Sequence, residues 1–244
     1  MSTEAVIHID HLNKSFGTNH VLRDFSFDLL RGESVVVLGK SGSGKSVLIK
    51  CIIGLITPDT GKVEVFGNEI PELSREALDK VRVKVGFLFQ SNALYDSMTV
   101  RENLEFPLRR HWIEKNKETV NDLVMEALTN VGLSHTVDMM PSELSGGMRK
   151  RIALARTLIL KPEIILYDEP TTGLDPITGM EIIHLISDIQ KKYNTSSLII
   201  SHDMNCVKYA ADRIVMLIDG KCYAVDTYEE LKKSNDSKVK QFFV

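Results

Sequence analysis

The spacing of apolar and polar residues divides the chain into a strand-rich start, a helical middle and a strand-rich end. Short apolar runs with strand character cover residues 6–9, 25–29, 34–38 and 62–66. Turn residues, such as those at 58–61, separate these runs. The first third of the chain is therefore expected to be rich in β-structure.

Farther along, apolar positions recur at helical spacing from Glu118 to Val131 and from Arg149 to Leu160. Continuous apolar runs, typical of buried strands, then cover residues 164–167, 198–200 and 214–218. A helix over about residues 179–191 lies among them, and Thr227 begins a short helix with a capping-box pattern. This order predicts an α/β fold with a parallel sheet, crossover helices and a helical insertion.

Composition places the chain among ordinary globular proteins. Its 244 residues include 30 Lys and Arg and 33 Asp and Glu, a net charge of −3, and 43% are hydrophobic. These values exclude a disordered, collagen-like or coiled-coil chain. At ~150 residues per domain, the length corresponds to about 1.6 domains. Because nucleic-acid phosphates require a basic field, which this near-neutral chain as a whole does not provide, we expect no nucleic-acid partner. A local basic patch is the alternative.

The sequence contains no run of about 18 apolar residues, the length that spans a bilayer. The best candidate, residues 47–56, is interrupted by Lys50 and Gly54, and residues 1–10 do not resemble a signal peptide. The three cysteines form no C-x-x-C pair and indicate reduced thiols. We therefore expect a cytoplasmic protein that does not cross a membrane itself.

A glycine-rich segment lies between the apolar run that ends at Leu38 and an apolar helix that begins at Val47. It has the pattern G-x-x-x-x-G-K-S, and its candidate phosphate-binding residues are Gly39, Ser41, Gly42, Gly44, Lys45 and Ser46. Backbone N–H groups and the helix N-terminus attract phosphate in such a P-loop. Lys45 then reaches the β- and γ-phosphates, and the Ser46 hydroxyl ligates Mg²⁺. The alternative is an ordinary turn before a core helix, and the loop alone leaves kinases, GTPases and motor ATPases open.

Two carboxylates, Asp168 and Glu169, end the apolar run at 164–167. Adjacent side chains of a strand point in different directions, which gives the two residues different roles. Beside a P-loop, Asp168 is a candidate Mg²⁺ ligand and Glu169 is the candidate general base for the water that attacks the γ-phosphate. By itself, an acidic pair is more commonly the solvated end of a strand.

A second candidate anion site, L-S-G-G-M at residues 144–148, directly precedes the helical run at 149–160. Ser145 and the amides of Gly146 and Gly147 stand at a helix N-terminus, which suits a phosphate. In isolation the same residues are a turn that caps a helix. With the basic, Ala-rich segment that follows, the pattern resembles the L-S-G-G-Q signature of the ABC-transporter ATPases.

Other motifs of that family match in the expected order. Gln90 resembles the Q-loop glutamine, Asp175 lies in a segment like the D-loop, and His202 resembles the switch histidine. The resemblance implies that Gln90 contacts Mg²⁺ or water, that Asp175 belongs to the nucleotide site, and that His202 contacts the γ-phosphate. Phe16 resembles the aromatic residue that stacks on adenine. The alternatives are a structural histidine and a core phenylalanine.

The resemblance covers about residues 7–231 and implies a P-loop NTPase of the ABC ATPase type. Its fold is α/β, a mixed-sheet core with an antiparallel β subdomain and an inserted helical subdomain. The implied divisions are 1–90 and 162–226 for the ATP-binding core, 91–161 for the helical subdomain, and 227–244 for a short helix and tail. In this family ATP lies between the P-loop of one subunit and the signature of another. The resemblance therefore implies ATP and Mg²⁺ as cofactors and a homodimer as the active enzyme.

Met148, where the family commonly has Gln, and the segments at 88–95 and 99–109 resemble the Mla or Mkl-type ATPases of MCE-protein systems. This resemblance implies transport of phospholipids or other hydrophobic lipids between membranes, from the cytoplasmic face of the inner membrane. The implied partners are integral membrane permease subunits, an MCE-domain substrate-binding protein and a STAS-domain protein.

Two alternatives remain for the function: the ATPase of another ABC importer or exporter, and a non-transport ABC ATPase that regulates a membrane complex. Near the middle of the chain, Trp112 with Arg109, Arg110 and His111 is suited to contact a permease. A solvated basic segment is the alternative for these residues.

Overall fold

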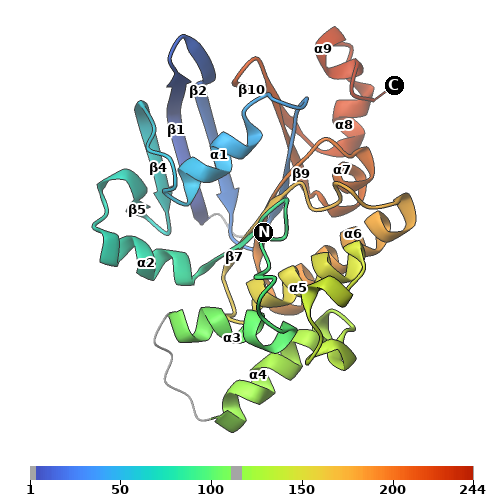
Figure 1. The fold of residues 1–244 in the computed structure, drawn as a ribbon. Helices are drawn as coiled ribbons and strands as arrows, with labels where there is room; N and C mark the ends of the chain where they lie inside the picture. The colour runs from blue at the N-terminus through green and yellow to red at the C-terminus, as the bar shows by residue number, and fades with distance from the viewer. Residues whose placement is uncertain (1–3, 111–116, 244) are drawn as a thin grey trace.

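Two β-sheets form the frame of the protein (Figure 1). The computed structural model describes residues 4–110 and 117–243. Within these ranges the smaller sheet is antiparallel, with the order β2-β1-β4-β5. Its strands are β1 (Ala5–Phe16), β2 (Asn19–Leu30), β4 (Thr60–Val65) and β5 (Asn68–Glu69). The larger sheet has the order β10-β9-β3-β8-β7-β6. Its strands are β3 (Ser34–Leu38), β6 (Val85–Leu88), β7 (Ile164–Asp168), β8 (Ser196–Ser201), β9 (Arg213–Ile218) and β10 (Lys221–Asp226).

Five neighbouring strands of the larger sheet, from β9 to β6, are parallel, and β10 pairs antiparallel with β9. Every residue of β3, β7 and β8 is buried, because the sheet is covered on both faces. Val35 and Val37 face the antiparallel sheet and helix α1 (Lys45–Ile52), whereas Val36 and Leu38 face the helices on the other side. Alternation along one strand thus serves two separate apolar clusters.

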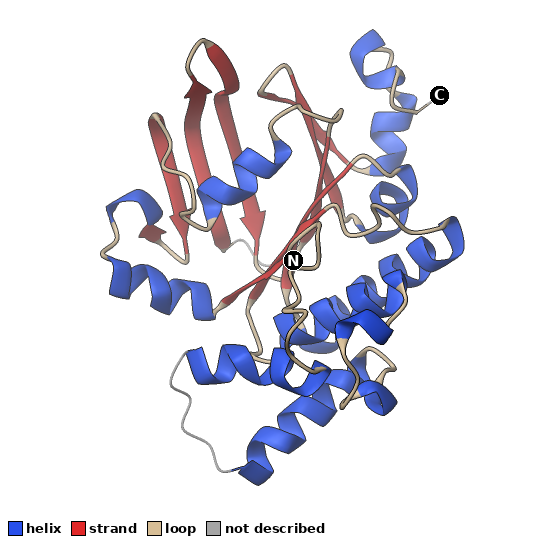
Figure 2. Ribbon diagram, in the orientation of Figure 1, coloured by secondary structure: helices blue, strands red, loops and turns tan. Residues whose placement is uncertain are grey.

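Among the described residues, three α-helices lie between β6 and β7 in the chain and gather below the strands in Figure 2. They are α3 (Val100–Arg110), α4 (Lys117–Asn130) and α5 (Gly146–Leu158). Helix α2 (Arg75–Val83) precedes β6, and Ser74 caps it by accepting a hydrogen bond from the Ala77 amide. The position of α3–α5 agrees with a helical insertion, and its limits at residues 91 and 161 stay a prediction.

The remaining helices follow β7 and pack beside the larger sheet (Figure 1). They are α6 (Pro176–Tyr193), α7 (Met204–Ala210), α8 (Tyr228–Lys233) and α9 (Ser237–Lys240). The Thr227 hydroxyl accepts from the Glu230 amide at 3.4 Å and so caps α8, as its sequence predicts. The rings of Tyr228 and Phe243 lie 5.4 Å apart, which holds the tail beside α8.

The predicted α/β fold is confirmed, and the boundaries of several elements differ from the prediction. Strand β1 continues seven residues beyond Ile9 because its later residues form an exposed hairpin with β2, whose polar residues hide the strand pattern. The signature helix starts at Gly146 rather than Arg149, because Ser145 supplies its N-cap. Helices α2, α3, α7 and α9 have no individual counterpart in the prediction.

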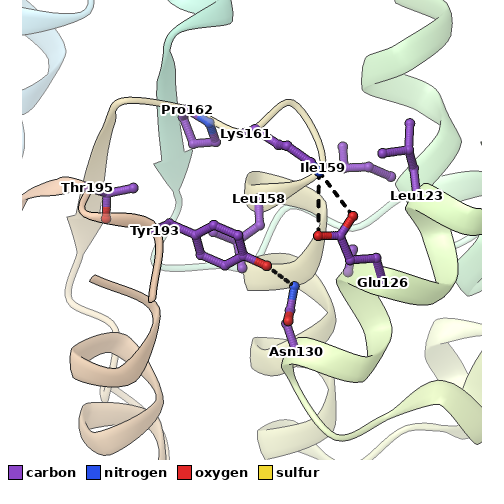
Figure 3. A pocket seen from close by; sticks show the side chains of 10 residues that line it. Leu123, Glu126, Asn130, Leu158, Ile159, Lys161, Pro162, Tyr193 and Thr195 are labelled. Atoms are coloured by element: carbon purple, nitrogen blue, oxygen red, sulfur yellow. Dashed lines mark hydrogen bonds and ion pairs between the residues drawn. The ribbon is translucent and has the colours of Figure 1, made fainter. Parts of the chain in front are cut away.

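The helical insertion is joined to the core around a small cavity of about 80 Å³, bordered by α4 and by the ends of α5 and α6 (Figure 3). Asn130 Nδ2 of α4 donates to Tyr193 Oη of α6 at 2.5 Å, and Lys192 Nζ donates to Asn130 Oδ1 at 2.6 Å. Lys161 Nζ pairs with Glu126 Oε2 at 3.1 Å. These polar contacts surround an apolar floor and fix α4 to the core.

Glu163, directly before β7, connects the ends of two other elements. Its carboxylate accepts from Arg31 Nη1 at 3.0 Å and pairs with Lys84 Nζ at 3.1 Å. Arg31 follows β2, and Lys84 precedes β6. The hydrogen bond from Arg31 holds the pKa of Glu163 below its usual value.

We predict that Glu163→Gln lowers the free energy of unfolding at pH 7 by less than about 1 kcal/mol, since the ion pair is partly exposed. A carboxylate with a lowered folded-state pKa stabilises the protein above its unfolded pKa, and this contribution disappears as the pH falls through the folded value. The difference from wild type should therefore shrink below about pH 4.5. Denaturant titrations at several pH values, with Glu72→Gln as an exposed control, check this; a constant difference would exclude the ion pairs as its source.

Candidate functional site

Four loops of the candidate site leave the same edge of the larger sheet. Strands β3, β6, β7 and β8 are parallel, so their carboxyl ends lie together. The segments that follow them carry the P-loop, Gln90, Glu169 and His202. Residues separated by more than a hundred positions are thereby brought to one place.

A cavity of about 320 Å³ opens at this edge. Its lining residues are Phe16, Val21, Ser41, Gly42, Gly44, Lys45, Ser46, Val47, Gln90, Glu169 and His202. All except Val21 and Val47 are residues that the sequence predicted for a nucleotide site. Phe16 is 50% exposed, with Lys14 Nζ 5.4 Å from its ring centre, so a face of the ring is available for stacking.

The backbone of the P-loop requires glycine at two places. Gly44, the residue before α1, has a φ of 105°, and a Cβ there would lie 2.8 Å from Val21 Cγ1. A Cβ on the buried Gly39 would lie 2.6 Å from Ser43 Oγ and 2.8 Å from the Leu217 carbonyl oxygen. The loop therefore approaches its neighbours through backbone atoms, which leaves the N-terminus of α1 open to an anion.

Lys45 is buried and its ammonium has three partners. Its Nζ donates to the carbonyl oxygens of Gly39 at 2.8 Å and Lys40 at 3.1 Å, and it lies 3.2 Å from Glu169 Oε1. The lysine thus spans the P-loop and reaches the acidic end of β7. A phosphate at the α1 N-terminus would compete with Glu169 for this charge.

Glu169 is held from two sides. Besides Lys45 at Oε1, the Nδ1 atom of His202 lies 2.8 Å from Oε2, a pairing in which the ring nitrogen carries the proton. Glu169 also has a φ of 49°, and its amide donates to the Ile200 carbonyl oxygen at 3.0 Å. Left-handed backbone at a buried, charged residue is characteristic of functional sites.

Asp168 points to a different partner, as the alternation of strand side chains requires. Its Oδ1 accepts from Ser46 Oγ at 3.2 Å. Burial is the main cause that raises the pKa of Asp168, and the Ser46 hydrogen bond opposes it. Ser46 and Gln90 both line the cavity, and Asp168 lies behind Ser46, its hydrogen-bond partner. The hydroxyl, the amide and the carboxylate form an oxygen-rich set that fits Mg²⁺.

The signature residues form a second cluster, and none of the described residues that line the nucleotide cavity belongs to it. Ser145 and Gly146 are exposed, and Ser145 Oγ accepts from the Met148 amide at 3.2 Å. A Cβ on Gly147 would lie 2.6 Å from Thr178 Cγ2, so glycine lets α5 approach α6.

Asp175 caps α6 by accepting hydrogen bonds from the amide and hydroxyl of Thr178, which lowers the pKa of Asp175. The side chain of Asp175 is therefore engaged within its own loop.

Several residues near the site are absent from the sequence prediction. Lys150 of α5 donates to the Gln90 carbonyl oxygen, and Arg156 of the same helix donates to the carbonyl oxygens of Asn92 and Ala93. Lys40 of the P-loop donates to Gln241 Oε1 of the tail at 3.0 Å. Lys150 is the middle one of three consecutive cations before the apolar run that begins at Ile152, so the local pattern does not single it out. The contact of Gln241 with Lys40 carries no sequence signal, since the two residues are 201 positions apart.

A family model described as ABC transporter matches residues 22–172, which is more than half of the chain. The chain belongs to the ABC transporter family. Membership confirms the predicted family and fold and makes the chain an ATPase subunit of a transporter, with ATP as its nucleotide. The roles of the individual site residues stay predictions.

Curated relatives match nearly the whole chain. The probable ribonucleotide transport ATP-binding protein mkl of Mycobacterium leprae (strain TN) is 40% identical over 99% of this chain and 70% of its own length. The intermembrane phospholipid transport system ATP-binding protein MlaF of Escherichia coli (strain K12) is 38% identical over 96% of this chain and 87% of its own.

A solved structure of the ATP-binding cassette MJ0796, dimeric and bound to ADP and Pi after hydrolysis, has the same fold. Its TM-score is 0.82 at 30% identity, over 91% of this ABC cassette and 98% of MJ0796. The similarity therefore extends over both the sheet and the helical insertion.

We predict that Glu169→Gln retains ATP binding and lowers turnover by about 10²–10⁴-fold, the effect of losing a general base. Because the neutral amide no longer pairs with Lys45 Nζ, ATP affinity should be equal to or higher than that of the wild type. Nucleotide titration and phosphate release measure the two quantities. Glu163→Gln, at the other end of β7, is the matched control and should keep its turnover. Wild-type turnover in Glu169→Gln would remove this residue from the role of base.

Proposed function

We propose that this ABC cassette hydrolyses ATP to drive a membrane permease that moves phospholipids or other hydrophobic lipids between membranes. The observation that carries the proposal is its 38% identity to a phospholipid transport ATP-binding protein over nearly the full length of both chains. The similar identity to a protein named for ribonucleotide transport makes ribonucleotides the alternative cargo.

The active form is a homodimer with two composite sites. The P-loop with Glu169 and the signature with Ser145 form separate clusters, so one chain does not complete a site alone. The dimeric state of the related cassette with ADP and Pi supports this arrangement. In the dimer, the exposed Ser145 and the Gly146 amide of one chain face the phosphates held by the P-loop of the other.

Within each site the side chains have distinct roles. Phe16 stacks on adenine, the P-loop amides and Lys45 hold the phosphates, and Ser46, Gln90 and Asp168 hold Mg²⁺. The ion neutralises charge on the phosphate oxygens when it is bound. Glu169 accepts the proton of the attacking water, and His202 keeps its carboxylate oriented through the 2.8 Å contact.

The permease surface lies on the helical insertion. A depression of about 440 Å³ is lined by Met98, Phe106, Arg109 and Arg110. Tyr95 is exposed next to it, with its ring 4.8 Å from that of Phe106. Apolar and cationic groups around a depression suit a protein partner. Trp112 and His111, which the sequence also suggests for this contact, lie outside the described residues.

Among residues 4–110 and 117–243, no helix has both the length and the apolar character needed to cross a membrane. A permease therefore supplies the path for lipid in this proposal. The cassette works on the cytoplasmic face of the inner membrane, with an MCE-domain protein and a STAS-domain protein as the further partners.

We predict that mixing Lys45→Ala with Ser145→Arg restores ATP hydrolysis. Each variant alone lacks one half of both composite sites. In an equal mixture half of the dimers combine the two variants and hold one intact site, so about a quarter of the wild-type rate should return if the sites act independently.

The control mixture pairs Lys45→Ala with Glu169→Gln. Both changes disable the P-loop half of a site, so this mixture should stay inactive. Equal rates in the two mixtures would contradict a composite site built from two chains.

We predict that affinity purification of the tagged cassette from its native membrane recovers a permease together with an MCE-domain protein and bound phospholipid. Protein and lipid mass spectrometry identify these components, and the tagged Lys45→Ala variant controls for loss of ATP binding alone. Recovery of a sugar, amino-acid or nucleotide permease without lipid would overturn the lipid assignment.

A further inference from the structure

Two lysines are buried among the described residues, Lys45 in the P-loop and Lys150 in α5. Lys150 is 2% exposed, and its Nζ donates to the Gln90 carbonyl oxygen at 2.9 Å. It lies five residues after Ser145, on the helix that begins at the signature. A buried ammonium is unfavourable unless it is paired, so this hydrogen bond fixes the positions of the Lys150 ammonium and the Gln90 carbonyl group.

The segment after Gln90 is held by a second cation of the same helix. Arg156 donates to the Ala93 carbonyl oxygen at 2.8 Å and to the Asn92 carbonyl oxygen at 3.0 Å. Asn92 and Ala93 have φ values of 64° and 52°, a backbone region that persists where the surroundings hold it. Three carbonyl groups of one short segment therefore point at two cations of α5.

Two features of its surroundings act in opposite directions on the pKa of Lys150. Burial lowers the pKa of Lys150 to about 8, and the negative charge of Asp168 opposes this shift. The Gln90 side chain lines the nucleotide cavity, while its backbone carbonyl is held by Lys150. One residue thus joins the nucleotide cavity to the signature helix.

We infer that Lys150 is a positioning residue, whose hydrogen bond to the Gln90 carbonyl oxygen orients Gln90 in the nucleotide cavity and links it to the signature helix. The inference rests on the proposed function, which gives Gln90 its role at the nucleotide. In that function, the signature of one chain contacts the nucleotide that is bound to the partner chain, whereas Gln90 contacts the nucleotide that is bound to its own chain. Helix α5 would therefore connect the two composite sites of a dimer.

The first test compares Lys150→Met with Lys150→Arg in the full chain. Loss of an outer partner of a metal-site residue reduces activity by about 10–100-fold, and we expect this fall in kcat for Lys150→Met. The KM for ATP should change less than about threefold, because the P-loop contacts remain. Lys150→Arg keeps a cation that reaches the carbonyl and should recover most of kcat.

Arg151→Met is the matched control, since Arg151 is the next residue of α5 and pairs with Glu181 of α6 at 2.6 Å rather than with the segment after Gln90. It should keep kcat within about threefold of wild type. If Lys150→Met does not fold, Lys150→Gln replaces it, and kcat should follow the order Arg above Gln. Equal, wild-type kcat in these variants would overturn the inference.

A double-mutant cycle tests whether Lys150 acts through Gln90. In a Gln90→Ala background, Lys150→Met should lower kcat by less than about threefold, because the side chain it orients is already gone. If the double variant instead lowers kcat by the product of the two separate reductions, the inference would be overturned. Wild-type kcat in Gln90→Ala would instead contradict the proposed role of Gln90, so the two failures are distinguishable.

Hydrogen exchange without nucleotide or Mg²⁺ gives a readout separate from activity. The Asn92 amide donates to the Phe89 carbonyl oxygen at 3.1 Å, and this turn depends on the held segment. Exchange over residues 90–95 should rise in Lys150→Met and remain at the wild-type rate in Arg151→Met. Unchanged exchange in Lys150→Met would show that its ammonium does not hold the segment.

Discussion

The parallel pairing of β3, β8, β7 and β6 is the constraint on which the nucleotide site depends. Leu38 pairs with Ser201, Asp168 with Ile200, and Leu88 with Tyr167, so the strands end close to one another. The backbone bonds of the sheet fix this register, and the buried apolar side chains on both faces prevent it from sliding. The loops that carry the P-loop, Gln90, Glu169 and His202 therefore start from a common edge. Side chains from these loops can therefore line one cavity.

At that edge the charged side chains pair with one another. Glu169 is held between Lys45 and His202, and Asp168 is held by Ser46. An arriving phosphate is a stronger partner for Lys45 than a carboxylate that already pairs with His202. In the proposed mechanism, ATP binding exchanges one ion pair for another and leaves Glu169 available to water. The groups that pair with one another in this structure are those that we propose act on the substrate.

The helical insertion is joined to this edge by α5. One end of that helix presents Ser145 to solvent, its middle holds the Gln90 carbonyl through Lys150, and Arg156 fixes the backbone after Gln90. On another side, Asn130 and Tyr193 tie the insertion to α6 (Figure 3). The contacts that we propose with a second chain, with the nucleotide and with a permease therefore lie on elements that are physically connected. This connection is what an ATP-driven transporter requires.

By itself, the sequence determined the chemistry whose parts are close together in the chain. Three motifs can be recognised in the sequence: the P-loop, the Asp168–Glu169 pair and the signature. Glycine spacing, strand runs and helix starts each depend on residues that are close together in the chain. The tertiary structure decided the rest: it placed Lys150 behind Gln90, and Gln241 beside Lys40. These placements depend on contacts between distant segments and on burial, and neither can be read from the spacing of residues along the chain.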